Sequence, residues 1–435
     1  MSEASHALVL TFEDARSVVE EHASHVTCGS SETLDLLQAI GRVLAEPIAA
    51  DRDIPPFPRS TRDGYAVRSS DLAKLPVQLA VKGEIKAGPL PANAPFVVHP
   101  GETFSIMTGA PVPEGADAVV MIEYTSLRED KDKDKDEEED RVEISRGVAA
   151  GENIVSQGAE AKWGALLLPK GTRLDETAIA LCASVGKSRL NIFTRPRIAV
   201  LTTGDEIVAV EAKVGPAQIR NSNSFSLAAQ IQRAGGEPVL LPIAPDEPRR
   251  LRELIEQGLQ SDLLLMTGGV SMGRYDLVEQ VLAEMSAEFF FTGAKIQPGR
   301  PVVFGRVPCG AGFLAGRSSD QPAYKYFFGL PGNPVSAMVT FELFAGPMLD
   351  ALAGMAPQPL LFLYARMKSE LRVKPGLRRF LPATLSGKYE DTQVESVPWQ
   401  GSGDIAARSR SNCYLVIPAD REHIKPGEWV SVLLR

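Results

Sequence analysis

The sequence predicts a multidomain protein that combines α/β and β parts. A central three-layer α/β domain with a mostly parallel sheet lies between an N-terminal helical and β region and a small C-terminal β domain. Three observations predict this. The 435 residues exceed what one hydrophobic core organises. From residue 196 onward, apolar strand-length runs alternate with helix-length segments, which favours parallel pairing with right-handed crossovers. On both sides of that part, short alternating runs punctuated by Gly and Pro are typical of small β domains.

Composition narrows the class of protein. The apolar content of 44% with 23% charged residues is typical of a globular protein, and the net charge of −9 argues against nucleic-acid binding as the main function. We find no signal peptide and no run of about 18 apolar residues, so we expect a cytoplasmic protein without a membrane partner. The four cysteines lie far apart in the sequence, which predicts that they are reduced thiols: Cys28, Cys182, Cys309 and Cys413.

The N-terminal region reads as helical. Thr11 and Asp14 form a variant capping box before a helix over 12–26, and the spacing of Leu and Ile predicts a second helix over 32–46. The string DIPPFP then forces an extended connection. A later helix over 175–186 ends at Gly186. We predict that residues 1–60 and 158–195 form one discontinuous domain.

Two β domains flank the α/β part. The first covers 61–157, with runs such as VQLAVKGEIKA, ADAVVMIEY and RVEISRGV. It contains the segment 128–141, which carries nine acidic and five basic residues and is most simply a solvated hairpin insertion, with metal buffering or docking as the alternative. The second covers 353–435, with runs such as PLLFLYARMK, NCYLVIPA and EWVSVLL.

In the predicted α/β domain, 196–352, three strands are followed directly by polar, glycine-containing strings. The predicted strands RIAVLT, DLLLMT and KYFFGL are followed by the polar strings TGDE, GGVSMG and PGNPVS. In an open parallel sheet the ligand crevice lies outside the carboxyl ends of the strands. Three such loops on one edge are more informative than any one of them.

The string LPGNPVSAM joins a predicted strand to a predicted helix. Asn333 falls at the N-cap and Pro334 at the first helical position, where the missing N–H is no loss. Gly332 allows close backbone approach, and the first-turn N–H groups with the Ser336 hydroxyl could seat an anion. An ordinary strand-to-helix turn is an equally good interpretation of these residues alone.

Two further strings carry glycines and carboxylates. MTGGVSMGRYD combines Gly268, Gly269 and Ser271 with Asp276, which suits a phosphate or a flat ring against backbone, although it lacks the lysine of a P-loop and the G-x-G-x-x-G spacing. TTGDEIV places adjacent carboxylates at a strand end, where they either hold Mg²⁺ through water or are simply surface acids in a turn: Asp205 and Glu206.

Other strings are ambiguous by themselves. KIQPGRPVVFG sets Lys295 and Arg300 around a Pro-Gly turn, which suits an oxyanion or is a basic hairpin tip. FPRSTRDGYAVR, IMTGAPVPEGADAVV and GENIVSQGAEA contain Asp63, Thr108 and Glu160 in polar turns.

Together these strings resemble the MoeA/gephyrin E-domain family, the molybdopterin molybdenumtransferases. PPFPRSTRDGYAVR, IMTGAPVPEGADAVVMIE, GENI, TGDE, IRNSN, TGGVSMGRYD, QPGRP and LPGNPVSA occur in that family's order and approximate spacing. The resemblance covers roughly 30–350 and weakens over the last 85 residues, where QGSGDI and NCYLVIPAD still resemble the family's last domain.

The resemblance implies a MogA-like central domain, an elongated homodimer and a reaction. Adenylylated molybdopterin and molybdate are the implied substrates, molybdenum cofactor and AMP the products, and Mg²⁺ the implied metal. It also implies transient contact with the molybdopterin adenylyltransferase and with molybdoenzyme acceptors. No Ser-His-Asp or Cys-His set indicates a covalent enzyme intermediate.

The resemblance also assigns roles to residues. Molybdate would lie at Ser336, Arg300, Pro301 and Ser402, whereas Asp63, Thr108 and Glu160 would come across the dimer interface. Catalytic roles are implied for Asp63, Thr108, Glu160 and Asp276. Metal binding is implied for Asp205, Glu206 and Asp276. Binding of substrate is implied for Asp205, Glu206, Asn221, Gly268, Gly269, Ser271, Lys295, Arg300, Pro301, Asn333, Ser336 and Ser402.

Three departures from the family pattern bear on anion binding. The family often has K-P-G-K-P where this chain has Gln297 and Arg300, so one positive charge is lost unless Lys295 supplies it. It often has aspartate where Glu160 stands. It often has G-R-x-x-F where this chain reads GLRRF, so either Arg378 or Arg379 acts from a shifted position or no residue replaces that arginine.

Two rival interpretations remain at this point. A molybdopterin adenylyltransferase would resemble only 196–350, and the strings before that part favour the molybdenumtransferase. A non-enzymatic scaffold is the other alternative, with 128–141 as its candidate docking element.

Overall fold

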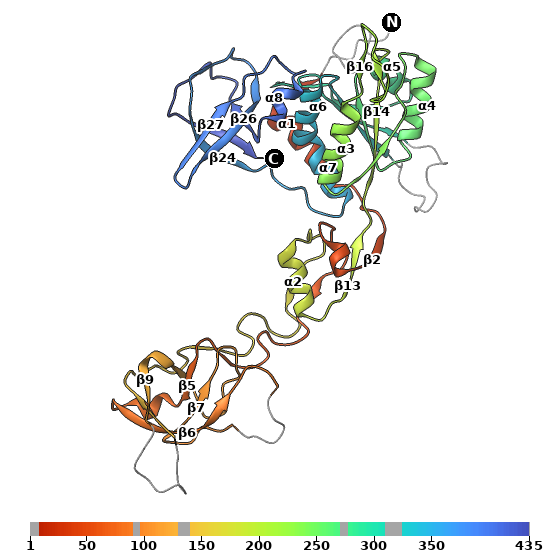
Figure 1. The fold of residues 1–435 in the computed structure, drawn as a ribbon. Coiled ribbons are helices and arrows are strands. Elements are labelled where there is room, and N and C mark those ends of the chain that lie inside the picture. The colour runs from red at the N-terminus through yellow and green to blue at the C-terminus, as the bar shows by residue number, and fades with distance from the viewer. Residues whose placement is uncertain (1–7, 90–95, 129–139, 270–276, 309–323, 435) are drawn as a thin grey trace. The chain divides into compact units, whose positions relative to one another are not determined.

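The computed structural model describes residues 8–89, 96–128, 140–269, 277–308 and 324–434 (Figure 1). The chain divides into two compact units, which we call the large unit and the small unit. The large unit consists of Met1–Ala45, Gly171–Asp175 and Arg189–Arg435, and the small unit of Glu46–Lys170 and Glu176–Ser188. The predicted fold class, a multidomain α/β plus β protein, is confirmed. The predicted four-part division of the chain stays a prediction.

A six-stranded sheet forms the centre of the α/β part, in the order β17-β14-β18-β23-β22-β19. The first four strands pair in parallel, as predicted, and the last two are antiparallel additions at one edge. The strands span Glu237–Leu240 (β17), Arg197–Thr202 (β14), Leu263–Thr267 (β18), Tyr324–Leu330 (β23), Val303–Pro308 (β22) and Glu288–Phe291 (β19).

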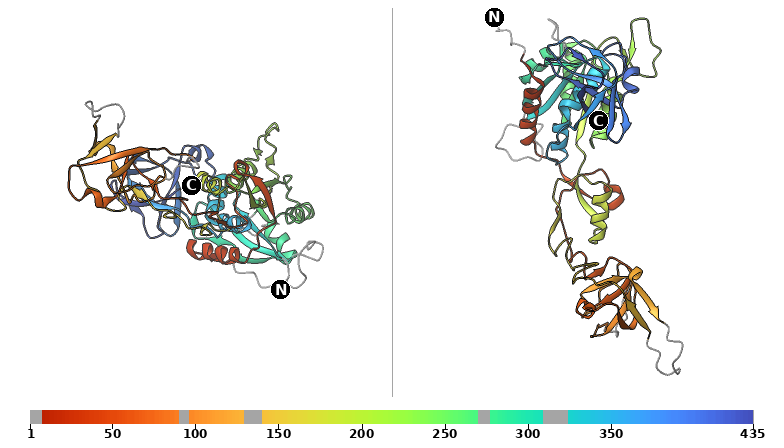
Figure 2. Two further views of the ribbon diagram at one scale, coloured as in Figure 1. Left: turned by 90° about the horizontal axis from the view of Figure 1, so that it is seen from below. Right: turned by 90° about the vertical axis from the view of Figure 1, so that its left-hand side faces the viewer.

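Helices cover both faces of this sheet, which makes the three layers. In β14, Ile198 and Val200 pack with α1, α3 and the helical segment after β23, whereas Ala199 and Leu201 pack with α4 and α5. Figures 1 and 2 show the two helical layers on opposite sides of the sheet. The helices span Phe12–Ser24 (α1), Asn223–Arg233 (α3), Pro248–Gly258 (α4), Leu277–Glu284 (α5), Pro334–Thr340 (α6) and Gly346–Leu352 (α7), with a π-helical turn over Phe341–Ala345.

Helix α1 begins where the capping signal predicts. The Thr11 hydroxyl oxygen accepts the backbone N–H of Asp14 at 3.1 Å. Arg16 is buried on the face that packs against α7, and Nη1 of Arg16 donates to the carbonyl oxygen of Leu343 at 2.7 Å. The N-terminal helix is thereby part of the α/β core.

The predicted helix over 32–46 is wrong. Ser31–Asp35 form strand β2, which pairs antiparallel with β13 (Arg189–Phe193), and only Leu36–Ala39 form a short 3₁₀ turn. Gly41 then has a φ of 72°, which a helix does not allow. Pairing with a strand that lies far along the chain overrides the local helical spacing.

The C-terminal sheet has the order β21-β26-β27-β24-β30-β28, and an added β26–β28 pairing closes it into a barrel-like form. Strand β21 belongs to the α/β part of the sequence and pairs in parallel with β26. The strands span Ile296–Gln297 (β21), Arg378–Lys388 (β26), Asp391–Ser396 (β27), Phe362–Met367 (β24), Trp429–Leu434 (β30) and Cys413–Ile417 (β28). Alongside lie α8 (Ile405–Ser409) and the pair β25 (Leu371–Arg372) and β29 (His423–Ile424).

The small unit carries the predicted β-rich segment as a six-stranded sheet in the order β8-β5-β7-β6-β10-β9. Strand β5 sends Tyr65 and Val67 into one hydrophobic cluster and Ala66 into another, so both sheet faces are covered. The strands span Ala118–Met121 (β8), Gly64–Val67 (β5), Glu102–Ile106 (β7), Val77–Ile85 (β6), Arg141–Ile144 (β10) and Thr125–Arg128 (β9).

Shorter elements complete the fold. The helix predicted to end at Gly186 is α2, and Gly186 has a φ of 75°. This helix spans Glu176–Ser184. Four two-stranded sheets remain: Ile48–Ala49 (β3) with Leu166–Leu168 (β12), Arg59–Ser60 (β4) with Ile154–Val155 (β11), Val9–Leu10 (β1) with Gly293–Ala294 (β20), and Ile207–Val208 (β15) with Ile219–Arg220 (β16). Two 3₁₀ turns span Ser69–Leu72 and Ile122–Tyr124.

One helical stretch in the described part of the chain, Pro334–Leu352, has the length and apolarity of a membrane span. Its most apolar window is 72% buried inside the protein, where Val335, Phe344 and Met348 pack against the sheet. Its apolar character is therefore explained by the core of the α/β part.

Candidate active site

Three loops meet at the carboxyl edge of the parallel strands, as the sequence predicts. Thr202 at the end of β14 is in register with Thr267 at the end of β18, and Thr267 is in register with Leu330 at the end of β23. The loops that follow these three strands therefore begin side by side. Their glycines and polar residues are brought together because the strands are neighbours in the sheet.

These loops line a cavity of about 670 Å³, a volume within the usual range for small-molecule sites. We call it the rim cavity. Residues from each of the three strand ends contribute, together with Asn223 from α3, Asp246 before α4 and Pro301. The remaining lining is Thr202, Thr203, Gly204, Glu206, Ile207, Ile219, Thr267, Gly268, Gly269, Leu277, Pro331, Gly332, Asn333 and Pro334.

The glycines after β18 are required by packing. Gly268 has a φ of 91°, and a Cβ there would lie 2.5 Å from the carbonyl oxygen of Thr203. Gly269 has a φ of 60°, and its Cβ would lie 2.9 Å from Cγ2 of Val278. Only glycine lets the β18 loop lie this close to the β14 loop, and the two loops together form one wall of the rim cavity.

A polar network beneath the rim cavity fixes Asn223. Its Nδ2 donates to the hydroxyl of Thr267 at 2.8 Å and to the carbonyl oxygen of Gly332 at 2.7 Å, and the Thr267 hydroxyl donates onward to the carbonyl oxygen of Pro331. Asn223 thus ties the ends of β18 and β23 to α3. Its Oδ1 is buried and has no partner among the described residues.

Sequence analysis assigned substrate binding to Asn221, the first asparagine of the string IRNSN. Asn221 does not line the rim cavity. Its amide is used inside the loop, where Oδ1 accepts the backbone N–H of Ser224 at 3.1 Å and Nδ2 donates to the Ser224 hydroxyl at 2.9 Å. Asn223, two residues later, was missed, and only its place at the start of α3 beside two strand ends could have indicated it.

Three carboxylates lie near one wall of the rim cavity. Glu206 and Asp246 line it, whereas Asp205 does not, because Oδ1 of Asp205 accepts the backbone N–H of Asp246 at 3.1 Å. Burial, and after it the charges of Asp205 and Glu206, raises the pKa of Asp246. Asp246 was missed by sequence reasoning, although its place as an acidic residue in the loop after β17 could have indicated it.

The number of carboxylates at the rim cavity suits Mg²⁺ that is also bound by water and substrate phosphates. Among the described residues no group of three or more His, Cys, Asp or Glu could enclose a metal ion. Mg²⁺ in phosphate-transfer sites usually takes only one or two carboxylates and completes its shell with water and substrate phosphates. Glu206 and Asp246 supply that number at the cavity wall, and their mutual repulsion would be relieved by a divalent cation.

The first turn of α6 is partly occupied by protein. Asn333 stands at the N-cap and Pro334 at the first helical position, as predicted, but the Asn333 side chain makes no capping hydrogen bond. The backbone N–H of Val335 donates to the carbonyl oxygen of Ser402 at 2.9 Å, so the predicted free N–H groups are reduced by one. This bond places Ser402 beside the first turn of α6, which also carries the buried Ser336.

The residues of the QPGRP turn and its neighbour Lys295 lie in different surroundings. Pro301 lines the rim cavity, whereas the side chains of Lys295 and Arg300 are exposed. Gln297 lines a second cavity, of about 590 Å³, together with Arg379 of the C-terminal sheet. Arg378 instead forms an ion pair with Glu13 on α1.

The small unit holds the other predicted residues. The backbone N–H of Thr108 donates to Oδ1 of Asp63 at 2.6 Å, and this bond, followed by the Thr108 hydroxyl, lowers the pKa of Asp63. Nη2 of Arg59 pairs with Oε1 of Glu160 at 2.9 Å. Glu160 lines a cavity of about 380 Å³ that also includes Gly109, the neighbour of Thr108. All three residues are exposed and available to a ligand or partner.

Ser271 and Asp276 lie outside the described residues, as do Cys309 and most of the acidic segment 128–141. Their predicted roles stay predictions.

The fold and the rim cavity define the class of protein: a MogA-like α/β domain embedded between additional β-rich regions. Three family models match consecutive parts of the chain. "MoeA N-terminal region (domain I and II)" matches residues 10–186, "Probable molybdopterin binding domain" matches 199–351, and "MoeA C-terminal region (domain IV)" matches 364–434. The chain belongs to the MoeA family of molybdenum cofactor biosynthesis, whose members are transferases.

Relatives extend over the whole chain. A molybdopterin molybdenumtransferase of Nostoc sp. is 33% identical and covers 93% of this chain and 88% of the relative. One from Haemophilus influenzae is 32% identical and covers 98% of both. A crystal structure of a molybdopterin biosynthesis MoeA protein from Pyrococcus horikoshii has a TM-score of 0.69 at 31% identity and covers 98% of this chain and 99% of that one.

The matches outside the α/β part distinguish this chain from the nearest rival. A molybdopterin adenylyltransferase was expected to resemble only 196–350, whereas the N-terminal and C-terminal MoeA models match most of the remaining residues.

Proposed function

We propose that this chain transfers molybdate to adenylylated molybdopterin, giving molybdenum cofactor and AMP with the help of Mg²⁺. The relatives' shared name supports the reaction class. The single structural observation that carries the proposal is the rim cavity, in which glycine-rich loops and two carboxylates meet at the carboxyl ends of three neighbouring parallel strands.

The residues that line the rim cavity have different proposed roles, which follow from their chemistry. The loops at Gly204, Gly268 and Gly332 offer backbone to phosphates, since no side chain separates the backbone from the cavity there. Glu206 and Asp246 would hold Mg²⁺, which when bound polarises a phosphoanhydride and neutralises its charge. Asn223 keeps the β18 and β23 ends at a fixed separation, so the substrate meets a preformed wall.

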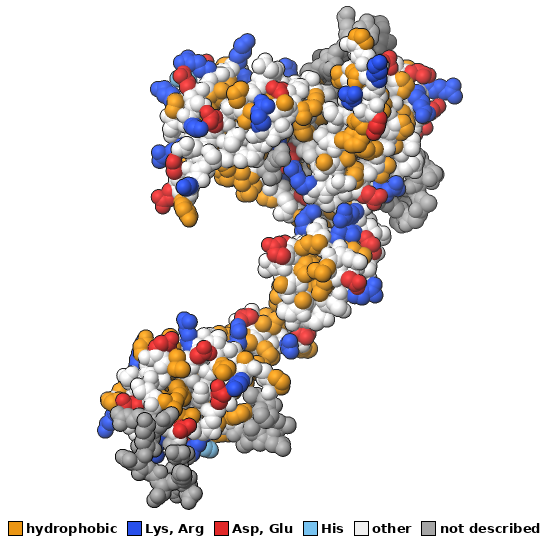
Figure 3. Space-filling model, viewed as in Figure 1, with side chains coloured by type: hydrophobic (Ala, Val, Ile, Leu, Met, Phe, Trp, Pro, Cys, Tyr) orange, Lys and Arg blue, Asp and Glu red, His pale blue; other side chains and the backbone are white. Residues whose placement is uncertain are grey.

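We further propose a homodimer in which Asp63, Thr108 and Glu160 of a second subunit complete the site. Exposed apolar side chains on both units support this assembly: Leu37 is 83% exposed, Trp163 75% and Leu166 62%. Hydrophobic side chains are also visible on the surface around α2 (Figure 3). Large exposed apolar side chains of this kind are suited to a subunit interface. We expect a cytoplasmic enzyme that receives its substrate from an adenylyltransferase and delivers product to molybdoenzymes.

The decisive experiment measures AMP release from adenylylated molybdopterin in the presence of Mg²⁺, with and without molybdate. We expect release that depends on both ions, and its loss in Glu206→Gln. Glu211→Gln, a change outside the rim cavity, is the control. Retained pterin binding without AMP in any mixture would reject the transferase and favour a carrier or scaffold.

The dimer is tested separately by light scattering of Leu37→Asp and of the unaltered protein. A mass of twice 46.8 kDa for the unaltered protein, lowered to one chain in the variant, is expected. A single-chain mass for the unaltered protein would reject the dimer.

A further inference from the structure

Two polar side chains in the wall of the rim cavity carry a buried atom without a hydrogen-bond partner. These atoms are Oδ1 of Asn223 and the hydroxyl oxygen of Thr203, and neither has a partner among the described residues. Asn223 is 7% exposed and Thr203 4%, and both residues line the rim cavity. Buried polar atoms in proteins are nearly always hydrogen-bonded, so we expect a group from outside the chain to pair with these two.

The hydrogen bonds of Asn223 settle which end of its amide is left unpaired. Nδ2 donates to the Thr267 hydroxyl at 2.8 Å and to the carbonyl oxygen of Gly332 at 2.7 Å. A carbonyl oxygen can only accept, so the amide atom that contacts it must be the nitrogen, and the flipped orientation is excluded. The unpaired atom of Asn223 is therefore an acceptor, and the group that pairs with it must be a donor.

Thr203 is held against the glycines that follow β18. Its backbone N–H donates to the carbonyl oxygen of Thr267 at 3.0 Å. A Cβ at Gly268 would lie 3.1 Å from Oγ1 of Thr203, and a Cβ at Gly269 would lie 3.0 Å from it. The hydroxyl thus lies where the β14 and β18 loops meet, and it can accept one hydrogen bond and donate another.

The other side chains of the rim cavity suit a flat ring. Ile207, Ile219 and Leu277 provide apolar contact. The charged residues of the described lining are Glu206 and Asp246, which accept hydrogen bonds when ionised. Apolar walls with a few placed polar atoms are typical of sites for small organic ligands. A planar heterocycle that carries N–H donors fits this set of groups.

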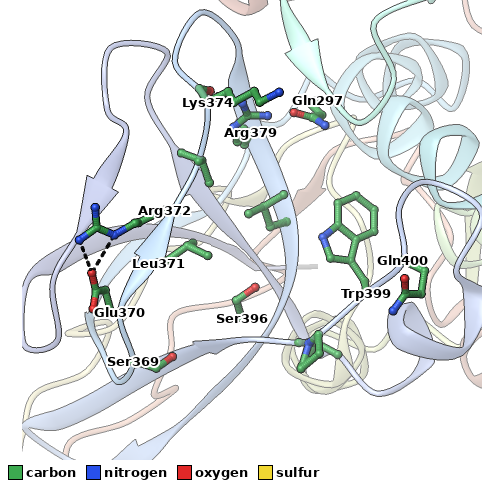
Figure 4. Close-up of a pocket in the computed structure, with 14 residues that line it drawn as sticks. Gln297, Ser369, Glu370, Leu371, Arg372, Lys374, Arg379, Ser396, Trp399 and Gln400 are labelled. Atoms are coloured by element: carbon green, nitrogen blue, oxygen red, sulfur yellow. Dashed lines mark hydrogen bonds and ion pairs between the residues drawn. The ribbon is translucent and has the colours of Figure 1, made fainter.

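The second cavity of the large unit, around Gln297, has the opposite character. Figure 4 shows Arg372, Lys374 and Arg379 among its lining, together with Trp399. These side chains offer N–H donors, whereas the unpaired amide atom of the rim cavity accepts. A ring edge with N–H donors is therefore matched to the rim cavity and not to the second cavity.

We propose that Asn223 and Thr203 recognise the amino-bearing edge of a planar heterocycle, whose N–H group donates to Oδ1 of Asn223. This inference rests on the proposed function, because the substrate proposed there carries two such rings, the pterin and the adenine. It assigns specificity to two residues to which the resemblance gave no role. Ring recognition at Asn223 and Thr203 is separate from the proposed metal binding at Glu206 and Asp246.

The first measurement compares ligands on the unaltered full-length protein. Pterin is compared with lumazine, and AMP with inosine 5′-monophosphate, because the second compound of each pair has an oxygen where the first has an amino group. An oxygen placed against Oδ1 of Asn223 leaves two acceptors unpaired. The dissociation constants within one pair should therefore differ by about 10- to 100-fold in favour of the amino compound. Fluorescence titration for the pteridines and calorimetry for the nucleotides measure them, and the pair that differs identifies the ring.

Thr203→Val and Asn223→Ala test the two residues. Thr203→Val removes a hydroxyl that has no partner in the described protein, so the unfolding temperature should not fall, while the preference for the amino compound should shrink by about threefold or more. Asn223→Ala should reduce the preference to about onefold. It also lowers stability, because the carbonyl oxygen of Gly332 loses its donor.

Gln230→Ala is the matched control for Asn223→Ala. Gln230 is an amide on the same helix, and its Nε2 donates to the carbonyl oxygen of Met338 at 3.0 Å, but it does not line the rim cavity. The change should lower stability and leave the preference for the amino compound as it is in the unaltered protein. A purely structural role of Asn223 would make the two variants behave alike.

Several results would overturn the proposal. These are no binding of any of the compounds to the unaltered protein, affinities within about threefold in both pairs, a full preference in both Thr203→Val and Asn223→Ala, or an equal loss of preference in Gln230→Ala. If Asn223→Ala does not fold, Thr203→Val and the ligand comparison decide. Failure of AMP release in a protein that keeps the preference would contradict the proposed reaction and leave this recognition standing.

Discussion

Gln297 and Arg379 are register partners in a two-residue parallel pairing between β21 and β26. Through this pairing the QPGRP turn of the α/β part and the GLRRF string of the C-terminal part, 82 residues later, form one wall of a cavity. Both strings depart from the family's pattern, and the departures meet at the same place. Two segments that are distant in sequence therefore share one cavity wall.

Gly268→Ala tests the close approach of the β18 and β14 loops. The new Cβ would collide with the backbone of Thr203 and would also require a left-handed conformation, so we expect a loss of about 2–4 kcal/mol in stability and weaker pterin binding. Gly427→Ala is the matched control, since Gly427 has a φ of 82° with open space around its Cβ position. It should lose only about 1–2 kcal/mol, with pterin binding unchanged. Thermal unfolding and fluorescence titration measure both effects, and equal losses in the two variants would contradict the collision.

Asp246→Asn tests the carboxylate pair of the rim cavity. The pKa of Asp246 is raised above that of the unfolded chain, so its contribution to stability is present below pH 3.8 and is lost as pH rises through the folded pKa. Removing the charge should therefore raise the unfolding temperature at neutral pH. If Asp246 helps to hold Mg²⁺, the Mg²⁺ concentration for half-maximal AMP release should rise by about tenfold.

Glu247→Gln is the control for this change, since Glu247 is adjacent in sequence but does not line the rim cavity. An Asp246→Asn protein with unaltered Mg²⁺ dependence would remove Asp246 from the proposed metal site.

Arg16→Met tests the docking of α1. Nη1 of Arg16 donates to the carbonyl oxygen of Leu343 at 2.7 Å in a buried hydrogen bond, and Nη2 donates to that of Gln358 at 2.9 Å in a part-buried one. The methionine side chain can make neither bond. We expect the protection of α1 amides against hydrogen exchange to fall by about 2–3 kcal/mol. Glu20→Gln removes only the charge of a half-exposed ion pair with Arg16 and should cost less than about 1 kcal/mol. Similar losses in both variants would show that the ion pair, and not the carbonyl contacts, holds the helix.

The surroundings of His22 predict that the stability of α1 depends on pH. Its ring stacks on Phe290 with centroids 3.8 Å apart, and burial, followed by the charge of Arg306, lowers the pKa of His22. A lowered pKa means that the unfolded segment binds protons first, so stability is present above pH 6.5 and is lost as pH falls through the folded pKa. Hydrogen exchange of α1 at pH 7.5 and 5.5 should therefore show less protection at the lower pH.

His22→Phe keeps the stacking but cannot titrate, so its protection should depend less on pH. The charged groups that act on His22 besides Arg306 are Glu288 from β19, Glu21 from α1 and His25 at the C-cap of α1. An unchanged pH dependence in His22→Phe would assign the effect to one of these groups.

The sequence by itself determined the features that depend on local pattern. Alternating strands and helices between 196 and 352 predicted the parallel sheet, and the strings after three of its strands predicted the edge at which a ligand cavity forms. The N-cap at Thr11 and the helix end at Gly186 were also local, since each depends on a few adjacent residues.

Only the tertiary structure decided the features that depend on distant pairing. The segment 32–46 has helical spacing, but β2 pairs with β13 more than 150 residues away, and that pairing decides its conformation. Strand register likewise separates Arg378 from Arg379, because adjacent residues in a strand point to opposite faces: Arg378 pairs with Glu13, and Arg379 lines a cavity with Gln297. Asn223 and Asp246 became visible as cavity residues only when the sheet brought their loops to one edge.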